Sequence, residues 1–481
     1  MKDLLKQFVL TIQSVIQSSS INLEVSETIY CRDKILEFNY IDDTPTWQSQ
    51  NQYITKKNYI PSAEVINLIK DSTYYKLILE ETIKDDSKID SISLDSLIDF
   101  FTNFILNNSD FHENQIDLFI EQFLSDINQE PFKCSANIEL SGIIIKAAPI
   151  EFSINGFKII LREIRIQDLE EDHIIYPYLN LSPVKSSPTC VPSAILNIES
   201  YILEKWKLQL EIEKIIAILR LFKVCSARYI SYKLDSEAIL WQRRIGGTIT
   251  SLKYLNVVPY KKIKITEQDV ANLIYFYRKI VNYIPECLYE SNIENKGMVH
   301  LAIAYRHYCE AILNNTTLEE KITNAVIGLE ALILSENQEI AFRFCIRGAK
   351  ILSLFNYSAI EVKKKLKAAY NIRSTFVHGD DIELEKEVRK LDQNYQSQDF
   401  LIEILDYLRV LIIIIIFLSK QNEFVNSKRG VNNFEKRKFL DIVDDSLIDK
   451  QQENKLNNIL EEVKYLIDLL MTFNPEKNLR T

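Results

Sequence analysis

From residue 266 to residue 418 the sequence repeats one pattern, with apolar residues at intervals of three and four between short polar turns. This spacing is typical of amphipathic helices, because one helical turn takes 3.6 residues. Six helices are predicted, at Thr266–Tyr283, Val299–Leu313, Leu318–Leu334, Glu339–Phe355, Ala359–His378 and Phe400–Leu418. Helices in such close succession predict a compact helical bundle over residues 262–424.

The sequence outside the bundle divides into three regions. Residues 1–130 are predicted to be mainly helical, and residues 131–260 are predicted to be α+β, because β-branched runs surround the hairpin signal Asn155-Gly156. Residues 425–481 are predicted to be a charged tail with one amphipathic helix at residues 456–471. The predicted fold class is therefore multidomain and mostly α.

Some boundaries within these regions can be predicted more closely. The N-terminal helices are expected at Lys2–Gln17, Ser62–Glu81, Leu94–Leu106 and Glu113–Ile127. A strand is expected at Thr28–Tyr40, followed by a polar loop that includes Gln48–Gln52. The α+β region is expected to contain strands within 132–145, 150–164, 194–198, 227–232 and 248–257, with a helix at 201–222 and an exposed loop at 181–192.

Composition limits the possible functions. The formal net charge of −10 argues against a protein that wraps nucleic acid along its whole surface, so any RNA contact requires a local basic patch. The seven cysteines are scattered without metal-ligand spacing, which favours reduced thiols in the cytoplasm. The longest apolar run, Val410–Leu418, is less than half of the ~20 residues that span a bilayer. No membrane contact, metal or cofactor is predicted.

One pair of residues in this chain is suited to catalysis. Arg373 precedes His378 by five positions, and Gly379 follows as a helix-ending residue. On a regular helix the two side chains are about 140° apart around the axis. They can act on one phosphate if the helix end bends, if the side chains adjust, or if a second copy contributes. An ion-paired arginine and a helix-capping histidine are the non-catalytic interpretation.

The segment that leads to this pair is basic, in contrast to the chain as a whole. Between residues 343 and 373 there are eight basic residues and one acidic residue, Glu361, which gives a local charge of +7. Such a field attracts a polyanion. RNA contacts are predicted at Arg343, Arg347, Lys363, Lys364 and Lys367.

Three segments in this order resemble the Apea-like branch of the HEPN superfamily. They are the helix containing Leu329-Glu330-Ala331-Leu332, the arginine-bearing helix from Phe342 to Ala349, and the ending Arg373-Ser374-Thr375-Phe376-Val377-His378-Gly379. The resemblance covers residues 265–424. It implies a bundle of four to five helices that pairs with a second copy through the helices carrying the motif, as a homodimer or higher homo-oligomer.

The resemblance also implies an activity. Many members are metal-independent endoribonucleases that serve as toxins or antiviral effectors. Arg373 would stabilise the charge on the phosphorane, and His378 would move protons as the ribose 2′-hydroxyl attacks, which leaves 2′,3′-cyclic phosphate ends. Glu330 is predicted to support Arg373 by a hydrogen bond or ion pair. Active members often have Asn, Asp or His after the arginine, whereas this chain has Ser374.

Other functions remain open from the sequence. The first 260 residues would sense a trigger or restrain the nuclease, possible partners being a regulatory protein or a phage-derived molecule. Alternatively, the bundle is a catalytically silent HEPN module that serves as a dimerising platform for RNA or protein. A weaker alternative is a module that works with a separate nucleotidyltransferase.

Overall fold

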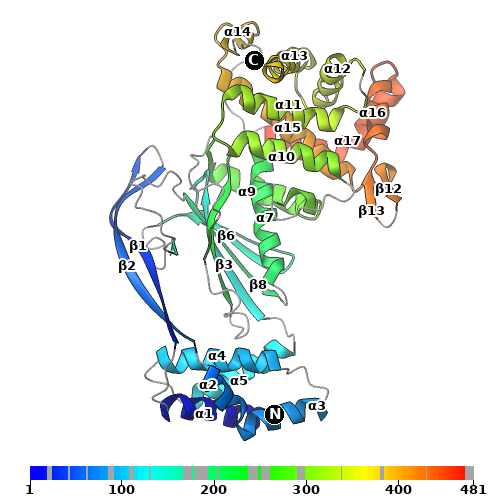
Figure 1. Ribbon diagram of the computed structural model, residues 1–481. Coiled ribbons are helices and arrows are strands. Elements are labelled where there is room, and N and C mark those ends of the chain that lie inside the picture. The colour runs from blue at the N-terminus through cyan, green and yellow to red at the C-terminus, as the bar shows by residue number, and fades with distance from the viewer. Residues whose placement is uncertain are drawn as a thin grey trace.

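The computed structural model describes residues 1–18, 24–41, 44–60, 63–84, 91–107, 113–128, 132–165, 176–177, 193–202, 205–236, 248–250, 261–289, 298–336, 338–379, 384–428 and 431–471. Helix accounts for 68% of the described residues and a smaller sheet region accompanies it, so the prediction of a mostly α chain is confirmed. Figure 1 shows the N-terminal helices at one end, the sheet in the middle and the large helical bundle at the other end.

The N-terminal helices enclose a hydrophobic core of their own. Apolar residues at helical spacing, such as Leu5, Phe8 and Ile12, are fully buried in it. The predicted helix over 62–81 is two helices, because the chain turns at Asp71 and the Ser72 hydroxyl accepts a hydrogen bond from the Tyr75 N–H (3.3 Å) that starts the second. The helices are α1 (Lys2–Ser18), α2 (Ala63–Lys70), α3 (Thr73–Lys84), α4 (Ser91–Asn107) and α5 (Glu113–Ile127).

A long antiparallel hairpin connects α1 to α2 (Figure 1). Its strands are β1 (Glu24–Ile41) and β2 (Thr44–Ile60), with one register shift between Ile35 and Glu37. The predicted polar loop at Gln48–Gln52 is therefore wrong, since these residues lie within β2. Backbone groups form the ladder, so a polar sequence can extend a strand.

The central region is a six-stranded antiparallel sheet in the order β10-β9-β3-β8-β6-β5. The predicted hairpin at Asn155-Gly156 is confirmed, because both residues have positive φ values (50° and 83°) and join β5 to β6. The predicted loop at 181–192 lies outside the described residues. The strands are β3 (Phe132–Ser141), β5 (Ile150–Ile154), β6 (Phe157–Glu163), β8 (Ala194–Ile202), β9 (Arg228–Ser236) and β10 (Thr248–Thr250), and the helix of this region is α7 (Lys205–Phe222).

Strand β4 (Ile143–Lys146) pairs in parallel with β11 (Ile263–Thr266) where the sheet region meets the bundle. Gly142, just before β4, has a φ of 83°, and a Cβ there would lie 2.4 Å from the Ser226 carbonyl oxygen. Gly156 has the same φ, but nothing lies within 4 Å of its Cβ position. A comparison of substitutions at Gly142 and Gly156 therefore distinguishes the effect of backbone strain from that of steric overlap.

We expect Gly142→Ala to lower the free energy of unfolding by about 1–3 kcal/mol more than Gly156→Ala, because only the first substitution adds overpacking to backbone strain. Urea denaturation of both variants measures the difference. Equal losses would show that the backbone around Ser226 moves aside freely.

The predicted bundle helices are present, most with ends within three residues of the prediction. The third and fifth begin at polar capping residues, because Thr317 and Ser358 accept hydrogen bonds from the backbone of Glu320 and Glu361. The helices are α9 (Glu267–Ile280), α10 (Val299–Leu313), α11 (Leu318–Ile333), α12 (Ile340–Ser353), α13 (Ala359–His378), α14 (Leu384–Arg389) and α15 (Ser397–Leu418).

Helix α15 forms the centre of the bundle. Its residues from Ile404 to Leu418 are all buried, which explains why this stretch is apolar on every side except at Asp406 and Arg409. The buried Arg409 donates to the carbonyls of Leu221 (2.7 Å) and Phe222 (3.2 Å) at the end of α7, and it pairs with Asp406. One hydrophobic core runs from the sheet into the bundle. Within the described ranges, no helix has the length and apolar character needed to cross a membrane.

The segment after residue 424 is more structured than predicted. It forms the hairpin β12 (Val425–Lys428) and β13 (Val431–Phe434), then helices α16 (Lys436–Asp445) and α17 (Lys450–Met471). The prediction of a tail with a single helix is therefore wrong in its elements. The apolar faces of both helices join the bundle core, through buried residues that include Phe439, Leu440, Val443, Leu456, Leu460 and Val463.

Candidate functional site

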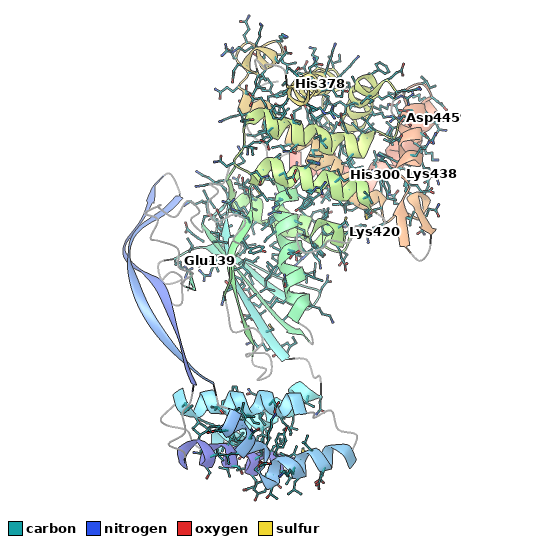
Figure 2. All side chains as sticks on the ribbon, in the orientation of Figure 1. Glu139, His300, His378, Lys420, Lys438 and Asp445 are labelled. Carbon is teal, nitrogen blue, oxygen red and sulfur yellow. The ribbon has the colours of Figure 1, made fainter. Side chains whose placement is uncertain are left out.

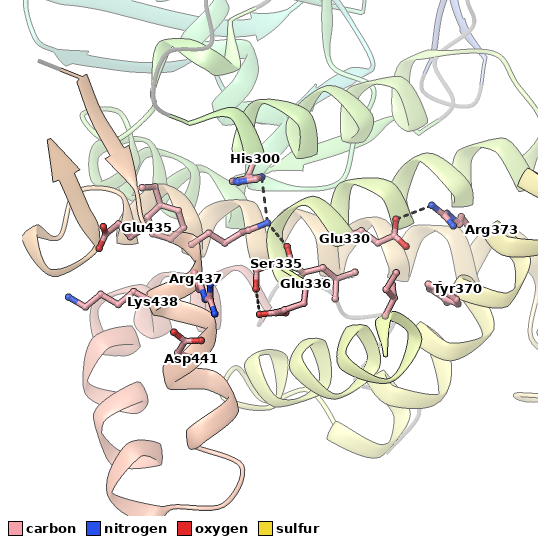
Figure 3. Close-up of a pocket in the computed structure, with 14 residues that line it drawn as sticks. His300, Glu330, Ser335, Glu336, Tyr370, Arg373, Glu435, Arg437, Lys438 and Asp441 are labelled. Carbon is pink, nitrogen blue, oxygen red and sulfur yellow. Dashed lines mark hydrogen bonds and ion pairs between the residues drawn. The ribbon is translucent and has the colours of Figure 1, made fainter. Parts of the chain in front are cut away.

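A pocket of about 820 Å³ lies between the C-terminal end of α11, the middle of α13 and the start of α16 (Figure 3). Its walls come from segments that are far apart in the sequence. The segment after residue 424 contributes six of the fourteen lining residues, and residues 300–373 contribute the other eight. The lining residues are His300, Glu330, Leu334, Ser335, Glu336, Ile340, Tyr370, Arg373, Phe434, Glu435, Lys436, Arg437, Lys438 and Asp441.

Arg373 and Glu330 form one wall of the pocket. The Arg373 Nη2 donates to Glu330 Oε2 at 3.3 Å, so the predicted contact between these two residues is confirmed. Burial raises the pKa of the Glu330 carboxyl, although the charge of Arg373 opposes that shift. The Arg373 Nε is buried and has no hydrogen-bond partner in the described part of the chain. The guanidinium therefore keeps an unused donor.

His378 lies away from this wall. It is the last residue of α13 and is exposed, and Gly379 follows in the left-handed conformation (φ 76°), as a helix-ending glycine should. Figure 2 shows it at the top of the bundle, apart from His300 and Lys438. Ser374 is half-buried and, like His378, does not line the pocket. One copy of the chain thus presents the two predicted catalytic residues on different surfaces.

The predicted RNA contact at Arg347 is wrong for this conformation. The Arg347 side chain is only 1% exposed, and it pairs with Asp444 through two bonds, Nε to Oδ1 (2.8 Å) and Nη2 to Oδ2 (2.6 Å). Its Nη1 donates to Glu336 (3.0 Å) and to the Ile333 carbonyl (3.1 Å). Arg347 fastens α16 to the bundle and is not accessible to a ligand.

The other predicted RNA-binding residues are more accessible. Arg343 is one-third exposed and forms looser ion pairs with Glu336 (3.6 Å), Asp444 (3.8 Å) and Glu339 (3.9 Å). Lys364 is exposed and pairs with Glu361 at 3.1 Å. Lys363 and Lys367 are exposed, and neither forms an ion pair with another described residue. The local charge of +7 is therefore largely balanced by acids from outside the segment.

Lys436 and His300 form another polar contact in the pocket lining, which the sequence pattern did not predict. The buried Lys436 amino group donates to the carbonyls of Ala331 (3.0 Å) and Leu334 at the end of α11, and it lies 3.5 Å from His300 Nδ1. Burial lowers the pKa of Lys436 to about 8. Partial burial and the charge of Lys436 lower the pKa of His300. The apolar spacing at Phe439-Leu440 and Ile442-Val443 was the available signal that this segment packs on the bundle.

Comparisons with protein-family models, with curated proteins and with solved structures gave no match. The resemblance to the Apea-like HEPN branch therefore stays a prediction from the residues quoted above. In the portion of the chain that the structure describes, no three His, Cys, Asp or Glu side chains come together as a metal site. The functional proposal below is therefore based on Arg373, on Glu330 and on the pocket that they line.

Proposed function

We propose that this protein is a metal-independent endoribonuclease of the HEPN type, acting in the cytoplasm as a toxin or antiviral effector. His378 takes the proton of a ribose 2′-hydroxyl, and the 2′-oxygen attacks the adjacent phosphorus. Arg373 donates to the phosphoryl oxygens as their negative charge grows. The P–O5′ bond breaks and the 5′-oxygen takes a proton from solvent water, so the products carry a 2′,3′-cyclic phosphate and a 5′-hydroxyl.

The observation that supports this proposal most is that the Arg373 guanidinium makes few hydrogen bonds within the described part of the protein. Its guanidinium is only partly used, by a single 3.3 Å contact with a carboxylate whose pKa is raised by burial. Its buried Nε has no partner in the described residues. An arginine held at a pocket wall with a spare donor is suited to bind a phosphate.

The separation of Arg373 from His378 supports action as a homodimer. Exposed apolar side chains lie near the ends of α12 and α13 that carry the motif: Phe342 is 62% exposed and Val377 is 55% exposed. Such residues are typical of an interaction surface. A second copy placed on this face would bring another motif helix to the site.

We expect Phe342→Glu combined with Val377→Glu to shift the protein from dimer to monomer and to reduce RNA cleavage in parallel, because a charge on each side opposes burial of this face. Light scattering after size-exclusion chromatography measures the mass. Ile448, which is 91% exposed on the C-terminal segment, provides a control as Ile448→Glu. A monomer that cleaves RNA at the wild-type rate would contradict the need for a second copy.

The direct test is cleavage of end-labelled tRNA and a structured RNA in the presence of EDTA. We expect wild-type protein to cut and His378→Ala to be inactive, with cyclic phosphate ends on the wild-type products. Because His378 is exposed at a helix end, its replacement should not affect folding. Equal cutting by both proteins would place the activity elsewhere.

The alternative is a catalytically silent module that binds RNA or protein as a dimer. The observation that favours it is the neutralisation of the basic segment, since Arg347, Lys350 and Lys365 are engaged with Asp444, Glu453 and Glu403. Under this alternative, neither protein cuts RNA in the assay above, but Lys363→Glu combined with Lys367→Glu still weakens RNA binding. In the ribonuclease proposal, by contrast, the first 260 residues sense a trigger or restrain the nuclease.

A further inference from the structure

The pocket beside Arg373 has the size and lining of a small-molecule site. Its volume of about 820 Å³ falls within the ~300–1,000 Å³ typical of ligand pockets. Aromatic and aliphatic side chains line it together with charged ones, the apolar members being Leu334, Ile340, Tyr370 and Phe434. A single phosphate group would fill only a small part of this space.

The lining carries charges of both signs. Four basic side chains are balanced by four acidic ones, which are Glu330, Glu336, Glu435 and Asp441. Glu336 is paired with Arg347 (3.0 Å), and Glu435 accepts from Asn426 (2.8 Å). A balanced lining with separate positive and negative ends suits a molecule that has one anionic end and one end rich in hydrogen-bond donors.

One end of the pocket presents acceptors beside a donor group. Glu330 offers two carboxylate oxygens, of which one already accepts from Arg373, and the Arg373 side chain is 28% exposed and makes one hydrogen bond with the described residues. A complementary ligand edge has two N–H donors next to an acceptor. Guanine has this edge, with N1–H and the 2-amino group beside O6. Adenine offers a carboxylate only its single amino group, and it therefore fits this end less well.

The other end of the pocket carries a free cation (Figure 3). Arg437, at the start of α16, is exposed and makes no hydrogen bond or ion pair with another described residue. Lys438 lines the same end, although its amino group donates to the Glu423 carbonyl at 2.7 Å. A guanidinium binds a phosphate through two parallel N–H bonds. Arg437 is therefore placed for the anionic end of the ligand.

We propose that this pocket binds a guanine nucleotide with a single phosphate, with its base edge on Glu330 and Arg373 and its phosphate on Arg437. This site goes beyond the proposed ribonuclease, since it assigns a soluble ligand to a pocket that Glu330 and Arg373 share with residues after position 424. Arg373 cannot donate to a base and to an RNA phosphate at once. The nucleotide therefore competes with RNA for this arginine.

The test is isothermal titration calorimetry of the full chain with GMP, AMP, inosine 5′-monophosphate and guanosine. GMP is expected to bind saturably and at least about tenfold more tightly than AMP, because hydrogen bonds to a charged carboxylate are at stake. Inosine 5′-monophosphate, which lacks the 2-amino group, falls between them. Calorimetry measures binding and not cleavage, so its result tests the nucleotide site independently of the proposed ribonuclease activity.

Two substitutions examine the two ends of the pocket. Glu330→Gln replaces an acceptor by an amide donor and is expected to weaken GMP about tenfold. Arg437→Ala is expected to weaken GMP about tenfold but to leave guanosine unchanged, because guanosine has no phosphate. Arg306→Ala, an exposed arginine on α10 outside the lining, is the matched control and should bind GMP as the wild type does.

Several results would overturn the site. These are no saturable GMP binding by the folded wild type, equal affinities for GMP and AMP, binding of oligonucleotides alone, or an equal loss of GMP and guanosine binding in Arg437→Ala. Circular dichroism melting confirms that each variant is folded. Because Arg437 is exposed, its variant keeps the test valid even if Glu330→Gln fails to fold.

Discussion

Arg373→Ala is expected to lower kcat/KM for RNA cleavage by about 10²–10³-fold, which is typical of removing one donor to a developing oxyanion. Arg373→Lys should recover only part of this loss, because an ammonium keeps the charge but not the planar pair of N–H donors. Single-turnover cleavage of an end-labelled RNA measures the effect. Arg306→Ala, exposed on α10, controls for the loss of one positive charge.

This prediction separates a chemical role of Arg373 from a structural one. Its ion pair with Glu330 is partly exposed, with 28% and 16% of the two side chains accessible, and such a pair contributes little to stability. Arg373→Ala should therefore melt close to the wild-type temperature while losing activity. A variant that cuts RNA at the wild-type rate would remove Arg373 from the mechanism.

Arg347→Ala is expected to lower the free energy of unfolding by about 1.5–3 kcal/mol, because the buried guanidinium loses its hydrogen bonds to Asp444 and Glu336, whose side chains are partly exposed. The substitution leaves Asp444, Glu336 and the Ile333 carbonyl without their shared donor. It also frees α16 from α12. Chemical denaturation followed by circular dichroism gives the change in free energy.

Arg343→Ala is the matched control for this effect. Arg343 lies one turn earlier on α12 and faces the same acids, but it is one-third exposed and its contacts are 3.6–3.9 Å long. Its loss should cost less than about 1 kcal/mol. Similar losses for both variants would mean that the short hydrogen bonds of Arg347 stabilise the fold no more than the longer surface contacts of Arg343.

The sequence predicts the bundle well because its helices bury one face at regular spacing. Val299–Leu313 and Ala359–His378 match the observed helices end to end. Of the hairpin β1–β2, only the first strand was predicted. The second strand has a polar sequence, and its pairing depends on backbone hydrogen bonds that residue types do not indicate. Helix α16 was missed because its polar residues suggested a solvated tail, whereas its apolar face packs on the bundle.

The site was predicted in part for similar reasons. The contact between Arg373 and Glu330 was expected from the resemblance to the HEPN family, because both residues lie in the segments that carry it. Lys436 and His300 are separated by 136 residues and meet only because the C-terminal segment folds back. Arg347 has a sequence environment like that of Arg343, and only the packed structure distinguishes the buried arginine from the exposed one.

The distance along the chain between the walls of the pocket has a consequence for how the protein is made. A ribosome releases His300 long before Lys436, and at about 5–20 residues per second the 136 residues between them take roughly 7–27 s to synthesise. By the end of that interval the nascent bundle carries Arg373 and His378 but still lacks α16. The order of translation thus places the completion of the pocket after the emergence of both proposed catalytic residues.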